Sequence, residues 1–202
     1  MIWLRKGKVM GTTEPIRDKE DLKNFLNYYR NVRPSPRNYA MTVIGLHTAL
    51  RISDILNLKW KDVYHFQKNC FLKHICLCEK KTGKQSSVAM NQHVKEALET
   101  YRNTRRPKPD HYIFSKTTDN SLPICRSQAY RIIKKAAEET VCCHTHISCH
   151  SLRKTFGYHA WKQGISPVLL MDIFNHSSFD VTKRYLGIGQ DERDSIFLKN
   201  FY

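Results

Sequence analysis

Hydrophobic residues recur at helical spacing along most of this chain. A first helix is predicted to begin after Asp18, which can cap it, and to end before Pro34 and Pro36. Its buried face would carry Leu22, Phe25, Leu26 and Tyr29. The same spacing predicts further helices at about residues 38–50, from Ser53 as a cap, from Asn91, from Ser127, and at about residues 152–163 and 168–174.

In one region, hydrophobic and polar residues alternate instead, as in a β-strand. Residues 71–80 and 85–90 are separated by a lysine-rich segment around Gly83, which is typical of a basic antiparallel hairpin. We find no repeat or linker that would divide the sequence. The expected fold is therefore a mainly α domain with a small antiparallel β-sheet (α+β) over residues 14–202, after a basic lead-in over residues 1–13.

The charge of the chain narrows the choice of partner. Its 202 residues include 34 Lys and Arg against 18 Asp and Glu, a formal net charge of +16. Such a positive surplus attracts polyanions, and nucleic acid is the leading candidate partner. Binding of this kind weakens steeply as the salt concentration rises. A ribosome-associated or merely basic protein fits the charge equally well, and charge alone names no function.

Cysteine usage bears on the compartment. The seven cysteines are odd in number, Cys142 and Cys143 are adjacent, and no secretory signal is found. These features favour reduced thiols and a cytoplasmic protein. No apolar run approaches the roughly 18 residues needed to cross a bilayer, so membrane attachment is not expected.

A histidine and an arginine are the first candidates for chemistry. Arg153 follows His150 by three residues, so one helical turn presents an imidazole beside a guanidinium. An imidazole moves protons and a guanidinium grips phosphate, a pairing that suits phosphoryl transfer. His176 lies 23 residues after Arg153, and Tyr185 follows nine residues later.

Together with Thr48–Leu58 (TALRISDILNL), these motifs closely resemble the catalytic domain of the tyrosine recombinases, the phage integrase family. That family carries an arginine in a T-G-L-R-x-[ST]-[DE]-like segment, then H-x-L-R, then a histidine or tryptophan nine residues before a nucleophilic tyrosine. All three motifs occur here in order, and the resemblance covers about residues 14–200. It implies the fold of that catalytic domain.

The resemblance also implies roles for individual residues. Tyr185 would attack a DNA phosphodiester and form a 3′-phosphotyrosyl bond, while Arg51 and Arg153 neutralise the phosphate. His150 would act on the tyrosine proton as general base, and His176 would donate a hydrogen bond to a phosphate oxygen. No metal or other cofactor is implied.

Further residues follow from the same resemblance. A hairpin lysine would protonate the leaving oxygen; Lys81 matches best, with Lys80 and Lys84 as rivals. Asp54 would orient Arg51. Contacts to double-stranded DNA are expected from Lys84, Arg131, Lys134 and Lys154.

The chain departs from the family pattern in three places. Ala49 stands where the family usually has glycine, and Lys154 where many members have a second histidine. A separate N-terminal core-binding domain is expected to be absent, so the chain is either an excised catalytic domain or a short member. The tail from Gln190 to Tyr202 resembles a short amphipathic helix that either packs on its own core or docks on a neighbour in a homotetramer.

The segment from Cys142 to His150 crowds six potential metal ligands into nine residues. Adjacent cysteines share one tetrahedral ion poorly, no C-x2-C pair is present, and the recombinase motif accounts for His150. We interpret the segment as local packing, with a zinc ion on Cys143, His146 and Cys149 as the weaker alternative.

Three functions remain at this stage. The leading hypothesis is a site-specific recombinase that performs integration, excision or resolution for a mobile element. A nicking and closing enzyme of the type IB topoisomerase kind would use the same chemistry. A non-catalytic DNA-binding regulator would keep the fold, although a regulator does not need Tyr185.

Overall fold

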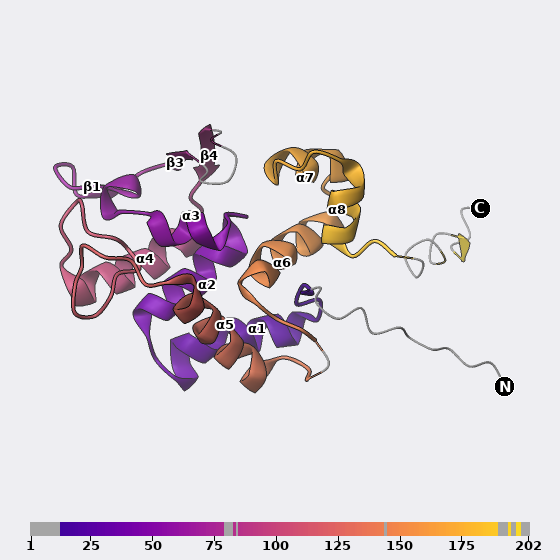
Figure 1. The fold of residues 1–202 in the computed structure, drawn as a ribbon, viewed down its shortest axis with the longest axis horizontal. Helices are drawn as coiled ribbons and strands as arrows, with labels where there is room; N and C mark the ends of the chain where they lie inside the picture. Colours follow the sequence, from indigo (N-terminus) through magenta and orange to yellow (C-terminus); the bar gives the residue numbers. More distant parts are fainter. Residues whose placement is uncertain are drawn as a thin grey trace.

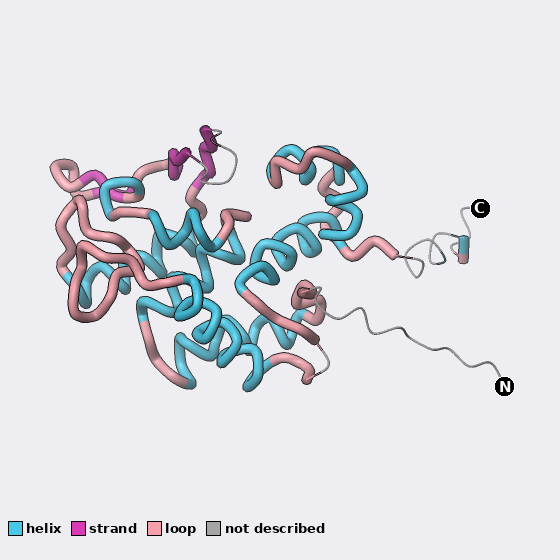
Figure 2. Tube along the Cα trace, in the orientation of Figure 1, coloured by secondary structure: helices cyan, strands magenta, loops and turns pink. Residues whose placement is uncertain are grey.

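Helices make up most of the molecule (Figures 1 and 2). The structure is a computed structural model that describes residues 13–78, 83, 85–143, 145–189, 194 and 197–198. Its α-helices are α1 (Lys19–Asn27), α2 (Pro36–His47), α3 (Ile52–Asn57), α4 (Gln92–Arg105), α5 (Arg126–Thr140), α6 (Cys149–Lys162), α7 (Pro167–Ile173) and α8 (Phe179–Leu186). A π-helical turn (Tyr28–Val32) and a 3-10 turn (Trp60–Asp62) complete the helical elements of the described residues.

The strands lie at one edge of this helical body (Figure 2). β3 (His74–Cys78) pairs antiparallel with β4 (Gln85–Ala89), which confirms the predicted hairpin, and Gly83 adopts a φ of 68° between them. A second pair, β1 (Tyr64–His65) with β2 (Cys70–Phe71), was not predicted. Strands of two residues are too short to produce an alternating pattern in the sequence. The predicted mainly α fold with a small antiparallel sheet is confirmed.

Several predicted helix boundaries were wrong. Helix α2 begins at Pro36, which suits a first helical position, and ends at His47 because Ala49 is left-handed with a φ of 56°. Arg51, not Ser53, is the cap residue of α3. Helix α5 likewise begins one residue before the predicted cap Ser127.

Two hydrophobic clusters hold the described residues together. The larger lies among α1 to α6, with α2 packed against both α4 and α6, and it includes Phe25, Ile44, Trp60, Leu98 and Ile133. The smaller lies where α7 and α8 pack on α6, and it consists of Ala49, Leu170, Phe174, Tyr185 and Leu186. The predicted nucleophile is therefore part of a small core of its own.

Helix α6 bridges the two clusters because two glycines let it approach its neighbours closely. Gly45 of α2 lies directly under the side chain of Leu152. A methyl group on Gly157 would lie 2.6 Å from the Phe174 ring, well inside van der Waals contact. The helix that carries His150 and Arg153 is thus fixed on both sides. None of the helices described has the length and apolar character that crossing a bilayer requires.

Candidate active site

The start of α6 places two of the predicted residues. Ser148 caps the helix: its hydroxyl accepts from the His150 backbone N–H at 3.2 Å, while its own N–H donates to the Ser151 hydroxyl at 3.0 Å. This reciprocal cap starts α6 at Cys149, three residues before the predicted start. His150 therefore lies in the first turn and Arg153 one turn later on the same face.

Helix α8 brings Tyr185 to His150. The helix ends at Leu186, followed by Gly187 with a φ of 67°, and the Tyr185 side chain near this end is 8% exposed. Its hydroxyl is hydrogen-bonded to Nε2 of His150, and the two rings meet edge-on with centroids 5.0 Å apart. The structure thus joins a phenol and an imidazole that are 35 residues apart in the sequence.

His176 also packs against the tyrosine ring, from the connection between α7 and α8. Its ring centroid is 4.7 Å from that of Tyr185 and 5.2 Å from that of Phe174. Nδ1 of His176 is hydrogen-bonded to the Thr182 hydroxyl at 2.9 Å. This bond fixes the orientation of the imidazole, with Nε2 at the opposite side of the ring.

Two backbone carbonyls hold the buried guanidinium of Arg153. Nη1 donates to the carbonyl of Ala49, and Nη2 donates to the carbonyl of Phe174 at 2.6 Å. The Phe174 ring also lies 4.9 Å from the guanidinium carbon, within cation–π range. Arg153 is 3% exposed, so its charge acts where little water screens it.

Arg51 stands at the start of α3 and is half-buried. Its carbonyl accepts from the backbone N–H of the buried Asp54 at 2.9 Å. The positive charge of Arg51 lowers the pKa values of His150, His176 and Tyr185, so it acts on all three. The structure therefore gathers the predicted residues of all three motifs.

The two imidazoles are kept neutral. Loss of water around the ring, followed by the charges of Lys154, Arg153 and Arg51, lowers the pKa of His150 to about 4. Burial and then the two arginines lower the pKa of His176 to about 4. At neutral pH each ring therefore has a nitrogen that can accept a proton.

The pKa of the Tyr185 hydroxyl is raised, in contrast to the lowered pKa values of the two histidines. Burial raises the pKa of its hydroxyl, and the nearby Arg153 and Arg51 only partly offset this effect. The tyrosine is thus a protonated phenol in the free protein, and it needs a base before it can act as a nucleophile. The Tyr185 hydroxyl is in hydrogen-bond contact with Nε2 of His150.

Not every predicted residue lies in this group. Lys80, Lys81 and Lys84, the basic lead-in up to residue 12 and most of the tail lie outside the described residues. Arg131 is exposed on α5, and Lys134 pairs with Glu138 at 3.4 Å. Lys154 points inward: its ammonium donates to the carbonyl of Thr13 at 2.6 Å.

Three supporting groups were missed by the sequence analysis. These are the Thr182 hydroxyl, which binds His176, and the carbonyls of Ala49 and Phe174, which bind Arg153. Thr182 is a buried polar residue on an amphipathic helix, and its sequence position gives no sign of a partner. Backbone carbonyls leave no trace in a residue pattern at all.

The cysteine and histidine segment does not form a metal site in the described part of the chain. No three histidine, cysteine, aspartate or glutamate side chains there come close enough to hold an ion, and Cys143, His146 and Cys149 are all described. Cys149 packs into the larger cluster, where burial raises the pKa of its thiol to about 11. Cys149 is thus packed locally, whereas Cys142 and Cys143 are exposed in the loop before α6.

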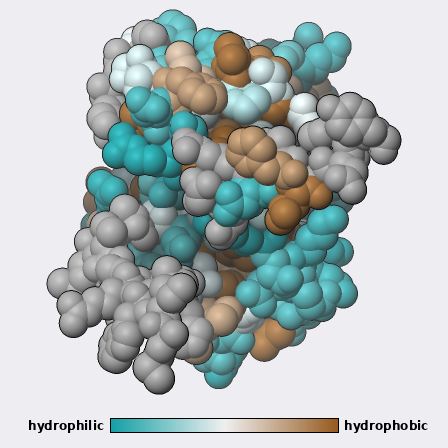
Figure 3. All heavy atoms as spheres, turned by 90° about the vertical axis from the view of Figure 1, so that its right-hand side faces the viewer, coloured by the Kyte–Doolittle hydropathy of each residue, from teal (hydrophilic) through white to brown (hydrophobic). Residues whose placement is uncertain are grey.

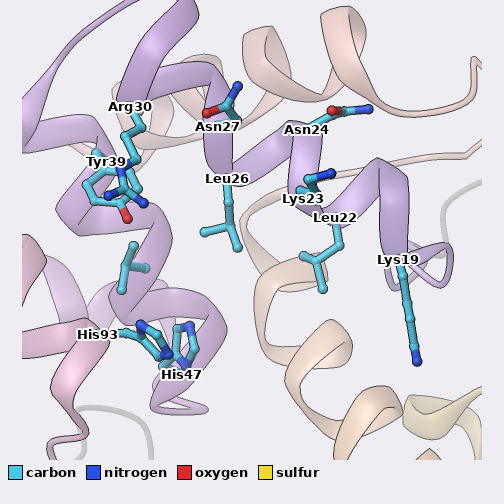
Figure 4. A pocket seen from close by; sticks show the side chains of 11 residues that line it. Lys19, Leu22, Lys23, Asn24, Leu26, Asn27, Arg30, Tyr39, His47 and His93 are labelled. Atoms are coloured by element: carbon cyan, nitrogen blue, oxygen red, sulfur yellow. The ribbon is translucent and has the colours of Figure 1, made fainter.

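A hollow of about 560 Å³ lies away from this chemistry, between α1, α2 and the start of α4 (Figure 4). Leu22 and Leu26 line it together with Arg30, which lies over Tyr39. His47 and His93 lie side by side at one end, with ring centroids 5.3 Å apart. None of the predicted catalytic residues lines this hollow.

Comparison with known proteins decides the family. The model of the phage integrase family matches residues 17–191, most of the chain. The chain belongs to the phage integrase family. The probable integrase/recombinase YoeC of Bacillus subtilis is 37% identical over 182 residues, which are 90% of this chain and 93% of that protein. A tyrosine recombinase of Pseudothermotoga lettingae is 27% identical over 159 residues, and the chain spans about half (51%) of its length.

Solved structures of tyrosine recombinases share the fold of this integrase-family chain. The crystal structure of XerA recombinase superposes with a TM-score of 0.72 at 20% sequence identity. The matched region is 94% of this chain and 68% of the XerA chain. XerH site-specific recombinase bound to palindromic difH substrate has a TM-score of 0.72 at 18% sequence identity. The match covers 93% of this chain and 54% of the XerH chain. These similarities confirm the predicted recombinase catalytic-domain fold.

Proposed function

We propose that this protein is a site-specific DNA recombinase that cleaves and rejoins strands through a covalent bond to Tyr185. The observation that carries this proposal is the hydrogen bond between the Tyr185 hydroxyl and a neutral His150, beside the guanidinium of Arg153. Membership of the phage integrase family supports it, as does a DNA-bound neighbour named XerH site-specific recombinase.

In the proposed step, Oη of Tyr185 attacks the phosphorus of a DNA phosphodiester while its proton passes to Nε2 of His150. The new bond joins the tyrosine oxygen to phosphorus, and the bond from phosphorus to the 5′-oxygen breaks. One phosphate ester replaces another, so nothing is oxidised or reduced. The leaving 5′-oxygen takes up a proton, for which we propose Lys81 as donor, with Lys80 and Lys84 as alternatives.

The surrounding charges would act on the phosphate. Arg153 and Arg51 would bind its non-bridging oxygens, where negative charge increases in the transition state. The carbonyls of Ala49 and Phe174 already orient the Arg153 guanidinium in the free protein. If the Thr182 hydroxyl donates to Nδ1 of His176, then Nε2 carries the proton and can donate to the phosphate.

Recombination joins two duplexes, and we propose that a homotetramer on double-stranded DNA carries it out. Apolar side chains are exposed around α7: Val168 is 68% exposed, Leu169 51% and Ile173 42%. Figure 3 shows hydrophobic side chains at the surface on the upper part of this side of the molecule. Phe197 and Leu198 in the tail are 85% and 83% exposed. These surfaces would suit contacts between protomers.

A nicked suicide DNA substrate of random sequence, with a chelator present, tests the proposed chemistry. The wild-type protein is expected to form a protein–DNA adduct that survives denaturant. Tyr185→Phe is expected to form none, because it lacks the attacking oxygen, whereas Tyr130→Phe on the exposed surface of α5 is expected to retain adduct formation. An adduct that persists in Tyr185→Phe would contradict the proposal.

A further inference from the structure

Residues 13–17, the segment before α1, are hydrogen-bonded to α6, the helix that carries His150. Ile16 is 1% exposed, and its N–H donates to the Thr155 hydroxyl of α6 at 2.9 Å. The carbonyl of Ile16 is hydrogen-bonded to Nε2 of His159, one turn further along α6, also at 2.9 Å. This segment, residues 13–17, therefore presents its carbonyl groups to α6 in a fixed position.

Lys154 connects this segment to the tyrosine. It lies on α6 one turn after His150, and its ammonium donates to the carbonyl of Thr13 at 2.6 Å. The same ammonium lies 5.5 Å from the centre of the Tyr185 ring. A cation at this distance from an aromatic ring attracts it, more strongly where water is partly excluded, and Lys154 is half-buried.

The charge of Lys154 also reaches His150. The groups that face this imidazole are Lys154 and Arg153 on α6, Arg51 at the start of α3, His176 before α8 and Tyr185 on α8. Among the charges, Lys154 has the largest effect in lowering the pKa of His150. One ammonium therefore acts on both the proton donor and the proton acceptor of the proposed step.

We propose that Lys154 is a positioning residue for strand cleavage: anchored by the Thr13 carbonyl, its ammonium holds the Tyr185 ring against His150 and helps keep that imidazole unprotonated in the free protein, ready to accept the tyrosine proton. This inference rests on the proposed function and assigns Lys154 a different role from the DNA contact that the resemblance suggested. A DNA contact needs an ammonium that faces the duplex, whereas this one is engaged with a carbonyl and a ring.

Titration of the histidines in the free protein tests the electrostatic part without any DNA. In Lys154→Met and Lys154→Gln, the pKa of His150 is expected to rise from about 4 toward its ordinary value, because a nearby positive charge is removed. Lys154→Arg is expected to leave it unchanged. The His150 resonance can be followed by NMR and identified by its loss in His150→Gln.

Lys162 offers a matched control on the same helix. Its ammonium lies 4.6 Å from the centre of the Trp161 ring, so Lys162→Met removes a similar cation from a similar ring away from the site. It is expected to leave the pKa of His150 unchanged. An unchanged pKa in both Lys154→Met and Lys154→Gln, or an equal rise in Lys162→Met, would overturn the proposal.

Adduct formation at saturating protein tests the positioning part. Lys154→Met and Lys154→Gln are expected to slow it about tenfold, while Lys154→Arg retains most of the rate and apparent DNA affinity changes less than about twofold. If Lys154 instead only contacts DNA, affinity and its salt dependence fall while the saturated rate stays unchanged. If the wild type forms no adduct, the proposed function and the positioning role fail together, and the histidine titration then tests only the effect of Lys154 on the pKa of His150.

Discussion

At the scale of single residues, the site depends on one alanine in an unusual conformation. Ala49 has a φ of 56°, in the left-handed region, and its carbonyl accepts from the guanidinium of Arg153. Glycine enters that region without a steric cost, whereas alanine does not. The alanine keeps the turn and adds a methyl group to the small cluster around Tyr185.

The substitution Ala49→Gly is expected to be close to neutral for stability. Relief of the left-handed conformation, about 1–2 kcal/mol, offsets the lost methyl contacts and the greater freedom of the unfolded chain. Ala40→Gly, in the middle of the right-handed helix α2, has no such relief and is expected to lose about 1 kcal/mol or more. Chemical denaturation of both variants measures the difference; equal losses would argue against strain at Ala49.

The two histidines predict how stability depends on pH. Because the pKa values of His150 and His176 are about 4 in the folded protein and near 6.5 when unperturbed, only the unfolded chain binds these protons in between. The free energy of unfolding should therefore fall as the pH is lowered from about 6.5 toward 4. Replacing both residues with glutamine should flatten this slope between about pH 6.5 and pH 5.

Denaturant unfolding at a series of pH values provides the measurement. His74→Gln, at an exposed position on β3, serves as the control and should keep the wild-type slope. The prediction is wrong if the double variant retains the full pH dependence.

At the scale of elements, α6 holds the chemistry because it packs closely against α2 and against the unit formed by α7 and α8. At Gly157, α6 and this second unit lie close: an added methyl group would lie 2.6 Å from the Phe174 ring and 3.1 Å from Leu186. Phe174 also supplies a carbonyl to Arg153. A change in this contact should therefore move both the arginine and the helix that carries Tyr185.

Gly157→Ala is expected to lower stability by about 1–3 kcal/mol, because the added methyl group forces Phe174 or Leu186 to shift. Adduct formation should fall with it, since the displaced groups position the reacting side chains. Among the described residues, the nearest atom to a methyl group added at Gly189 is the Gly187 carbonyl oxygen, at 4.0 Å, so Gly189→Ala should stay within about 0.5 kcal/mol of the wild type. Thermal unfolding and the adduct assay together measure both effects.

At the scale of the whole molecule, cleavage and assembly should be separable. The proposed chemistry uses side chains of one chain, whereas the proposed tetramer would use the tail and the exposed apolar residues near α7. Removal of residues 196–202 is therefore expected to weaken assembly on DNA more than cleavage at a single site. Native mass spectrometry or analytical ultracentrifugation of the protein–DNA complex can measure assembly, and the adduct assay measures cleavage. An equal loss of assembly and cleavage would contradict the separate roles.

The sequence by itself predicted most of the elements and the candidate reactive residues. Helical spacing, caps such as Asp18 and Asn91, and the hairpin around Gly83 follow from local interactions between neighbours, so they are readable from the order of residues. The motif spacing likewise identified the family that the comparisons confirmed.

Only the tertiary structure showed which of those residues lie in contact. The contact of Tyr185 with His150, the carbonyls on Arg153 and the place of Lys154 between Thr13 and Tyr185 all join segments far apart in the chain. The neutral state of the two histidines also depends on charges and burial contributed by other elements. Such effects arise from distance and solvent exclusion in three dimensions, which a one-dimensional pattern of residues does not contain.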